Sequence, residues 1–150
     1  MELIKENFEK HRRVFRDEDK IRKIWTAIDH NWLTNHVTLL EEVIPGYILG
    51  WGIRKEYMFI DCAIVPGVPA SEFEHTDEFV DRIKNFCLKQ ITNTEPYAHG
   101  DWALSNILVD GDTMRMVDWD NLGKYEHKEI IQKLNEDLSS AFGEKYQPIV

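Results

Sequence analysis

The segment from residue 97 to 121, YAHGDWALSNILVDGDTMRMVDWDN, is dense in side chains that could do chemistry. It holds one histidine, two asparagines and five aspartates. The aspartates stand at the ends of two apolar runs, Ile107–Val109 and Met114–Val117, which we expect to be buried strands. A carboxylate beside a core costs free energy unless something pairs with it. The carboxylates therefore either lie on solvated turns or converge on a cation.

Four residues of this segment have a spacing that favours the second alternative. His99, Asp101 and Asn106 fit the pattern H-G-D-x-x-x-x-N, and Asp118 follows the second apolar run in VDWD. This pattern resembles the catalytic loop of protein-kinase-like phosphotransferases, in the form found in aminoglycoside phosphotransferases and choline-kinase-like enzymes. In protein kinases the loop reads H-R-D-x-x-x-x-N, and the metal-binding aspartate of D-F-G follows it after a strand. The glycine between His and Asp is typical of the small-molecule kinases.

The resemblance implies a role for each of these residues. Asp101 would be the catalytic base, which orients or accepts the proton of the attacking hydroxyl. Asn106 and Asp118 would bind the Mg²⁺ ions that bridge the phosphates of ATP. Oxygen ligands on neighbouring strands suit a hard cation, so the expected cofactors are ATP and Mg²⁺. His99 would be structural and form hydrogen bonds beneath the loop.

The remaining polar and aromatic residues of the segment have simpler interpretations. Asp110 and Asp112 flank a glycine, and we assign them to the turn of a hairpin. Asp120 is either a further metal ligand or a solvated cap. Trp102 and Trp119 are predicted to belong to the core or to a pocket wall.

Apolar periodicity predicts the elements that position this loop. In the first half of the chain we expect a short extended piece at Arg12–Arg16, a helix capped by Asp17 that reaches Ile28, and a helix through Leu33–Leu40 that ends at Pro45. A hairpin formed by YILGWGIR and YMFIDCAIV follows. The second half should contain a helix over 77–91, preceded by capping-box spacing at Ser71 and Glu74, and a final helix through Ile130–Leu138.

This order predicts an α+β fold of the protein-kinase-like type, in one domain over residues 1–150. The N-terminal lobe, 1–65, would be minimal and consist of helices plus a β-hairpin. The C-terminal lobe, 66–150, would be small, mainly helical, and carry the catalytic-loop hairpin. The resemblance also covers YMFIDCAIVPGVPAS, which looks like the last strand and hinge of the small lobe. It implies that Ala63, Ile64 and Val65 present backbone groups to the adenine of ATP.

Two parts of the kinase pattern are not recognisable in the sequence. It has no G-x-G-x-x-G loop and no V-A-I-K strand, and the chain before residue 19 looks too short for three strands. The glutamate that pairs with the V-A-I-K lysine in kinases would fall near Asn35-His36, where the sequence has no acid. Candidates for the missing basic residue are Lys10, Arg13, Arg16, Arg54 and Lys55.

Composition narrows the class of partner. The chain has 27 acidic and 18 basic residues and a net charge of −9, which argues against a nucleic-acid partner. It shows no apolar window long enough to cross a bilayer, and its first residues are charged, so we expect no membrane insertion and no secretory signal. The two cysteines lie in apolar runs, which favours buried thiols in a reducing cytoplasm.

Three functions compete at this point. The first is a Mg²⁺- and ATP-dependent kinase that phosphorylates a hydroxyl of a small molecule. The second is a kinase-like binding or regulatory protein without catalysis, because the small lobe looks truncated. The third is a metal-dependent hydrolase with Asp101, Asp118 and Asp120 as its cluster. A reduced lobe could be completed by a second copy of the chain, so a homo-oligomer stays open.

Overall fold

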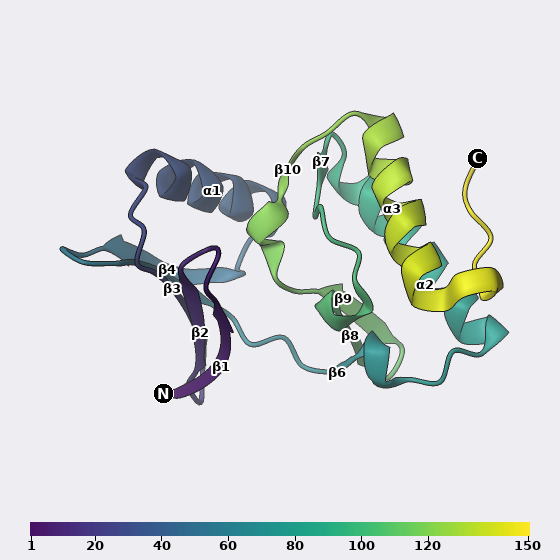
Figure 1. Cartoon of the computed structure of the whole chain (residues 1–150), viewed down its shortest axis with the longest axis horizontal. Coiled ribbons are helices and arrows are strands. Elements are labelled where there is room, and N and C mark those ends of the chain that lie inside the picture. The colour runs from purple at the N-terminus through teal and green to yellow at the C-terminus, as the bar shows by residue number, and fades with distance from the viewer. The chain divides into compact units, whose positions relative to one another are not determined.

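The computed structural model describes all 150 residues, which form two compact units, Met1–Ile64 and Val65–Val150 (Figure 1). The first unit contains a five-stranded sheet and one long helix. The second contains two long helices with short strands.

The sheet of the first unit is antiparallel throughout, with strand order β1-β2-β3-β5-β4. Its strands are β1 (Glu2–Asn7), β2 (Arg12–Arg16), β3 (Ile21–Trp25), β4 (Ile48–Ile53) and β5 (Met58–Cys62). The helix α1 (His30–Val43) starts where the Asp29 carboxylate accepts a hydrogen bond from the backbone N–H of Trp32 at 3.0 Å. It buries Leu33, Val37 and Leu40, the stripe that its sequence predicts.

The helix predicted from Asp17 to Ile28 is wrong, because residues 21–25 form β3. Asp17 caps no helix; its backbone N–H donates to the carbonyl of Lys20 at 2.9 Å, which closes the turn between β2 and β3. The first unit therefore has three strands before α1, although only two of them precede residue 19. Five-residue strands joined by tight turns need little chain.

The second unit is organised by α2 (Asp77–Thr94) and α3 (His127–Phe142), which contact each other. Thr76 caps α2 by accepting from the N–H of Phe79 at 3.1 Å, so the cap lies beyond the predicted Ser71–Glu74 pair. A capping box of Glu126 and Glu129 starts α3. The buried side chains of the two helices form the core of this unit: Phe79, Val80, Ile83, Cys87 and Ile91 from α2, and Ile130, Leu134, Leu138 and Phe142 from α3.

Short strands between these helices carry the segment that the sequence singles out. Strands β8 (Ile107–Asp110) and β9 (Thr113–Met116) form the predicted hairpin, and β6 (Val68–Pro69) pairs with β8. Strand β7 (Tyr97–Ala98) pairs with β10 (Gly123–Lys124). Single 3-10 turns lie at 70–72, 104–106, 119–121 and 143–145.

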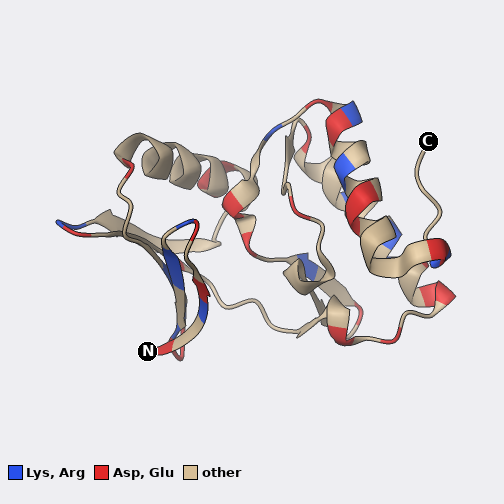
Figure 2. Cartoon of the chain, viewed as in Figure 1, with Lys and Arg blue, Asp and Glu red and all other residues tan.

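Acidic residues are spread over both units, and α3 carries both signs of charge along its length (Figure 2). No helix has the length and apolar character that a membrane crossing requires. Both cysteines are buried, as predicted, and burial raises the pKa of the Cys87 thiol.

Candidate active site

His99 organises the loop that follows β7. It is fully buried, its Nε2 lies 2.8 Å from the carbonyl oxygen of Val117, and its Nδ1 accepts from the backbone N–H of Asp101 at 3.2 Å. A carbonyl only accepts and an amide N–H only donates, so His99 is the neutral tautomer with its proton on Nε2. The ring of Trp119 packs edge-on against it, with centroids 4.6 Å apart. His99 is therefore structural, as the resemblance implies.

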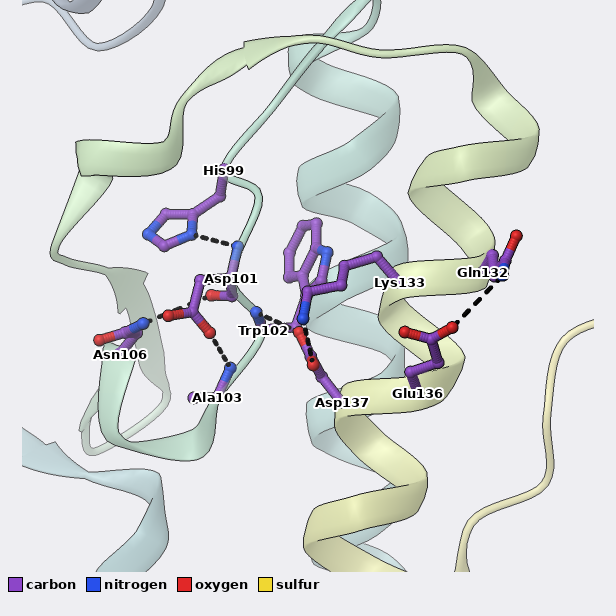
Figure 3. A network of polar contacts seen from close by, with 9 residues as sticks. All are labelled: His99, Asp101, Trp102, Ala103, Asn106, Gln132, Lys133, Glu136 and Asp137. Carbon is purple, nitrogen blue, oxygen red and sulfur yellow. Dashed lines mark hydrogen bonds and ion pairs between the residues drawn. The ribbon is translucent and has the colours of Figure 1, made fainter.

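Asp101 and Asn106 lie close together in this loop (Figure 3). The Oδ1 atom of Asp101 accepts from the backbone N–H of Ala103 at 3.2 Å. Asn106 is buried, and its Nδ2 donates to the carbonyl of Asp101 at 3.5 Å. The amide nitrogen of Asn106 thus faces Asp101, and its oxygen lies on the far side of the amide. This orientation leaves a carbonyl-type oxygen for a hard cation.

Asp118 is placed by the residue before it. The backbone N–H of Val117 donates to the carbonyl of Asn106 at 2.8 Å, and its carbonyl meets His99. Asp118 then adopts a left-handed conformation, with φ 60° and ψ 65°. A side chain other than glycine in this region costs roughly 1–2 kcal/mol, although Asp and Asn bear it better than most. Such strain is concentrated at functional sites.

Carboxylate and amide oxygens, such as those of Asp118 and Asn106, are ligands that suit Mg²⁺, which takes one or two protein oxygens and completes its shell with phosphates and water. No group of three or more His, Cys, Asp or Glu side chains is arranged to hold a metal ion. Asp101, Asp118 and Asp120 therefore do not form a group of this kind. Asp110 ends β8 and Asp112 lies in the turn before β9, on either side of Gly111, as predicted.

A carboxylate on α3 anchors the loop, and the sequence interpretation missed it. Asp137 accepts from the backbone N–H of Trp102 at 2.9 Å through Oδ2 and pairs with Lys133 Nζ at 2.9 Å through Oδ1 (Figure 3). The hydrogen bond to Asp137 raises the pKa of Lys133 against the cost of burial, and the charge of Asp101 adds to the rise. The signal in the sequence was the i,i+4 spacing of a lysine and an aspartate.

Gly100 is required by both its conformation and its surroundings. Its φ is +87°, and a Cβ atom there would lie 2.6 Å from the carbonyl oxygen of Asn121 and 3.1 Å from the hydroxyl of Tyr125. The position that is arginine in the protein-kinase motif therefore admits only glycine in this chain.

Lys23 is a buried basic residue of the first unit that the sequence interpretation did not single out. Lys23 lies on β3 and is 6% exposed. Cross-strand pairing puts it on the same sheet face as Val14 and Trp25. The five candidates named from the sequence, Lys10, Arg13, Arg16, Arg54 and Lys55, are all exposed. Lys23 did not stand out in the sequence because it interrupts an apolar run.

On α1 the glutamates point to solvent and a histidine points inward. Glu41 and Glu42 are exposed, whereas His36 is 6% exposed and lies with its ring stacked on Trp32, centroids 4.7 Å apart. Burial, with a further contribution from the charge of Lys23, lowers the pKa of His36 to about 4. His36 is therefore uncharged at neutral pH.

The predicted adenine segment follows β5. The backbone N–H of Ala63 donates to the carbonyl of Tyr47 at 2.8 Å, so this N–H is already used within the first unit. Ile64 and Val65 are partly exposed.

Comparison with protein-family models and with curated protein sequences gives no match. Comparison with solved structures gives several. Monomeric WbdD superposes with a TM-score of 0.67 and 17% sequence identity over 93% of this chain and 38% of that chain. A structure of the bifunctional kinase-methyltransferase WbdD superposes with a TM-score of 0.64 and 16% sequence identity, over 88% of this chain and 35% of that chain. WbdD in complex with the kinase inhibitor LY294002 superposes with a TM-score of 0.65 and 16% sequence identity, over 91% of this chain and 36% of that chain.

These matches show that the chain has a kinase-like α/β fold. The chain spans little more than a third of the length of the WbdD structures.

Proposed function

We propose that the chain is a Mg²⁺- and ATP-dependent phosphotransferase that moves the γ-phosphoryl group of ATP to a hydroxyl of a small molecule. The observation that carries the proposal is the clamp on Val117. Both of its backbone groups bind the catalytic loop, at His99 and at Asn106. Asp118 follows directly and has a left-handed backbone conformation, which supports a functional role.

Asp101 serves as the base. Its Oδ1 is held by the N–H of Ala103, which leaves Oδ2 to accept the hydrogen bond of the acceptor hydroxyl. The backbone of Asp101 is itself held at both sides, by His99 Nδ1 and by the side-chain amide of Asn106. Holding the carboxylate in this way aligns the attacking oxygen, and a positioned base contributes typically ~10²–10⁴-fold to the rate.

Asn106 and Asp118 would hold the metal, which neutralises charge on the phosphates when it is bound. Lys23 is the basic residue that we propose for binding the phosphates. Its place on the third strand agrees with the position of the phosphate-binding lysine in protein kinases. Ile64 and Val65 would contribute backbone groups to the adenine, with Ala63 contributing its carbonyl because its N–H is engaged by Tyr47.

The proposal is tested by thermal unfolding with ATP, with Mg²⁺, and with both. We expect a clear rise in melting temperature only with both, because the phosphates repel the carboxylates until the cation is present. Asp101→Asn should keep this rise and lose most ATP turnover in the presence of a panel of hydroxyl acceptors. A wild-type chain that shows no response to ATP with Mg²⁺ would refute the proposal.

A kinase-like binding protein without catalysis is the second candidate, and one observation favours it. The connection between β1 and β2 contains Phe8, Glu9 and Lys10 but no glycine, and Phe8 is 78% exposed. A glycine-rich loop normally covers the phosphates at this place. Retained Mg²⁺–ATP binding without turnover on any acceptor would support this candidate.

A further inference from the structure

The contact between α1 and β3 in the first unit brings in two polar residues, His36 on α1 and Lys23 on β3. The proposed function does not by itself explain the presence of His36 there. The helix contacts the strand through an aromatic chain. Trp25 of β3 meets Trp32 of α1 with ring centroids 5.4 Å apart, and Trp32 stacks on His36 at 4.7 Å. Lys23 shares the sheet face of Trp25. The histidine and the lysine therefore face a common interior.

His36 has a hydrogen-bonding capacity that the structure does not use. Its Nε2 atom is buried and has no hydrogen-bond partner. A buried polar atom without a partner costs about 1–3 kcal/mol, so its retention in a core position needs a reason. A leucine would continue the stripe of Leu33, Val37 and Leu40 without this cost. The unpaired nitrogen indicates a role that packing does not supply.

In protein kinases the lysine of the third strand forms an ion pair with a glutamate of the helix that follows. Here that helix is α1, and His36 is the only titratable residue on its buried face. Glu41 and Glu42 are exposed. No acid of α1 can therefore take the place of that glutamate.

We propose that His36 is a neutral positioning partner of Lys23: its Nε2 accepts a hydrogen bond from the ammonium group while Lys23 binds the phosphates of a nucleotide. A neutral acceptor orients the ammonium group without cancelling its charge. The phosphates then supply a negative charge that α1 itself does not offer to Lys23. This inference rests on the proposed function, because it assumes that the chain binds a nucleotide.

The arrangement predicts a specific ranking of variants at one position. His36→Leu keeps an apolar residue of suitable size but removes the acceptor, and His36→Gln keeps a neutral acceptor on a similar frame. We expect His36→Leu to weaken binding of Mg²⁺–ATP at least about tenfold, since hydrogen bonds to charged groups are of this strength. His36→Gln should stay within about threefold of wild type.

Binding of Mg²⁺–ATP and of adenosine, measured by calorimetry at pH 7.5, separates positioning from packing. Adenosine has no phosphates, so its affinity should be the same in all His36 variants. Lys23→Met should lose as much ATP affinity as His36→Leu or more, and the double variant should lose no more than Lys23→Met alone. Equal losses for ATP and adenosine, or additive losses in the double variant, would overturn the proposal.

A readout without nucleotide distinguishes this inference from the proposed function. In ¹H–¹³C NMR, His36 should titrate near pH 4 in the wild type and at higher pH in Lys23→Met, because the lysine charge opposes protonation. An unchanged titration would overturn the pairing even if ATP binds. The expected titration together with no ATP binding by the wild type would refute both the phosphate-positioning role and the proposed function, while the proximity of the two residues would stand.

Discussion

Asp137 of α3 accepts a hydrogen bond from the backbone N–H of Trp102 at 2.9 Å. This contact joins a helix to the residue directly after the proposed base, although the two partners are 35 residues apart in the chain. Trp102 itself is 1% exposed, so its N–H has no access to bulk water. The helix therefore fixes the backbone on one side of Asp101 while His99 fixes it on the other.

This contact gives the first prediction, for two variants of Asp137. Asp137→Ala leaves the N–H of Trp102 buried and unpaired, and should lower the free energy of unfolding by about 1–3 kcal/mol. Asp137→Asn keeps an oxygen for that N–H and loses only the pair with Lys133, which is about half exposed, so its effect should be under about 1 kcal/mol. Urea unfolding of both proteins measures the difference. Equal losses would show that the contact with Trp102 is not what matters.

The second prediction concerns the metal. Asp118→Asn should abolish the Mg²⁺-dependent binding of ATP while the chain stays folded. Asparagine is the better substitution than alanine here, because Asn also tolerates the left-handed backbone at this position. Melting temperature and ATP binding, each with and without Mg²⁺, check this. A variant that melts lower but still binds Mg²⁺–ATP would show that Asp118 is purely structural.

The third prediction concerns Gly100. Gly100→Ala should cost roughly 1–2 kcal/mol from the positive φ alone, with a further loss from the contact with the carbonyl of Asn121. The matched control is Gly46→Ala, which has a similar φ of +86° but open space around the added Cβ. The difference between the two variants in urea unfolding isolates the steric part. If Gly46→Ala is as destabilising as Gly100→Ala, crowding by Asn121 is not significant.

The fourth prediction is a pH dependence from His36. Its pKa is about 4 in the folded chain, below the ordinary value of 6.5. As the pH falls below 6.5, the unfolded chain binds a proton at this residue and the folded chain does not. Stability is therefore lost between pH 6.5 and 4, by up to about 3 kcal/mol, and this residue causes no further loss below pH 4. Lys23 is the charged group that faces it.

His36→Gln cannot titrate and should flatten this part of the curve of unfolding free energy against pH. The other buried acid-sensitive group of the first unit acts in a different window. The bidentate hydrogen bonds of Arg22 lower the pKa of Asp61 below 3.8, so its contribution is present above pH 3.8 and is lost only as the pH falls further. Of these two groups, only His36 therefore affects the free energy of unfolding measured in urea between pH 7.5 and 4.5. Identical curves for wild type and His36→Gln would contradict the prediction.

The sequence was most informative where the relevant contacts are local. The hairpin of β8 and β9 and the loop before it belong to one contiguous stretch, so motif and turn residues were sufficient to predict them. The helices α1, α2 and α3 were predicted because their apolar stripes are long. Strand β3 was mistaken for a helix because Ile21, Ile24 and Trp25 fit the helical period as well as a short strand.

The residues of the proposed site that the sequence did not single out depend on contacts that cross between elements. Lys23 becomes recognisable only when β3 is a strand covered by α1, and His36 only when the inward face of that helix is known. Asp137 contacts the loop only because α3 packs against it. Such contacts have no local signature, whereas the spacing of Asp101 and Asn106 is visible in the chain itself.

The two strand pairs around the candidate site are nested, and this nesting favours a particular order of folding for the site. The hairpin of β8 and β9 closes over a two-residue turn, whereas the pair of β7 and β10 closes around that hairpin. Once the inner hairpin has formed, the outer pair closes a loop that is effectively shorter, at a lower entropic cost. Asp101, Asn106 and Asp118 all lie between these two closures. The proposed base and metal ligands are thus brought together by short-range steps that require no contribution from the first unit.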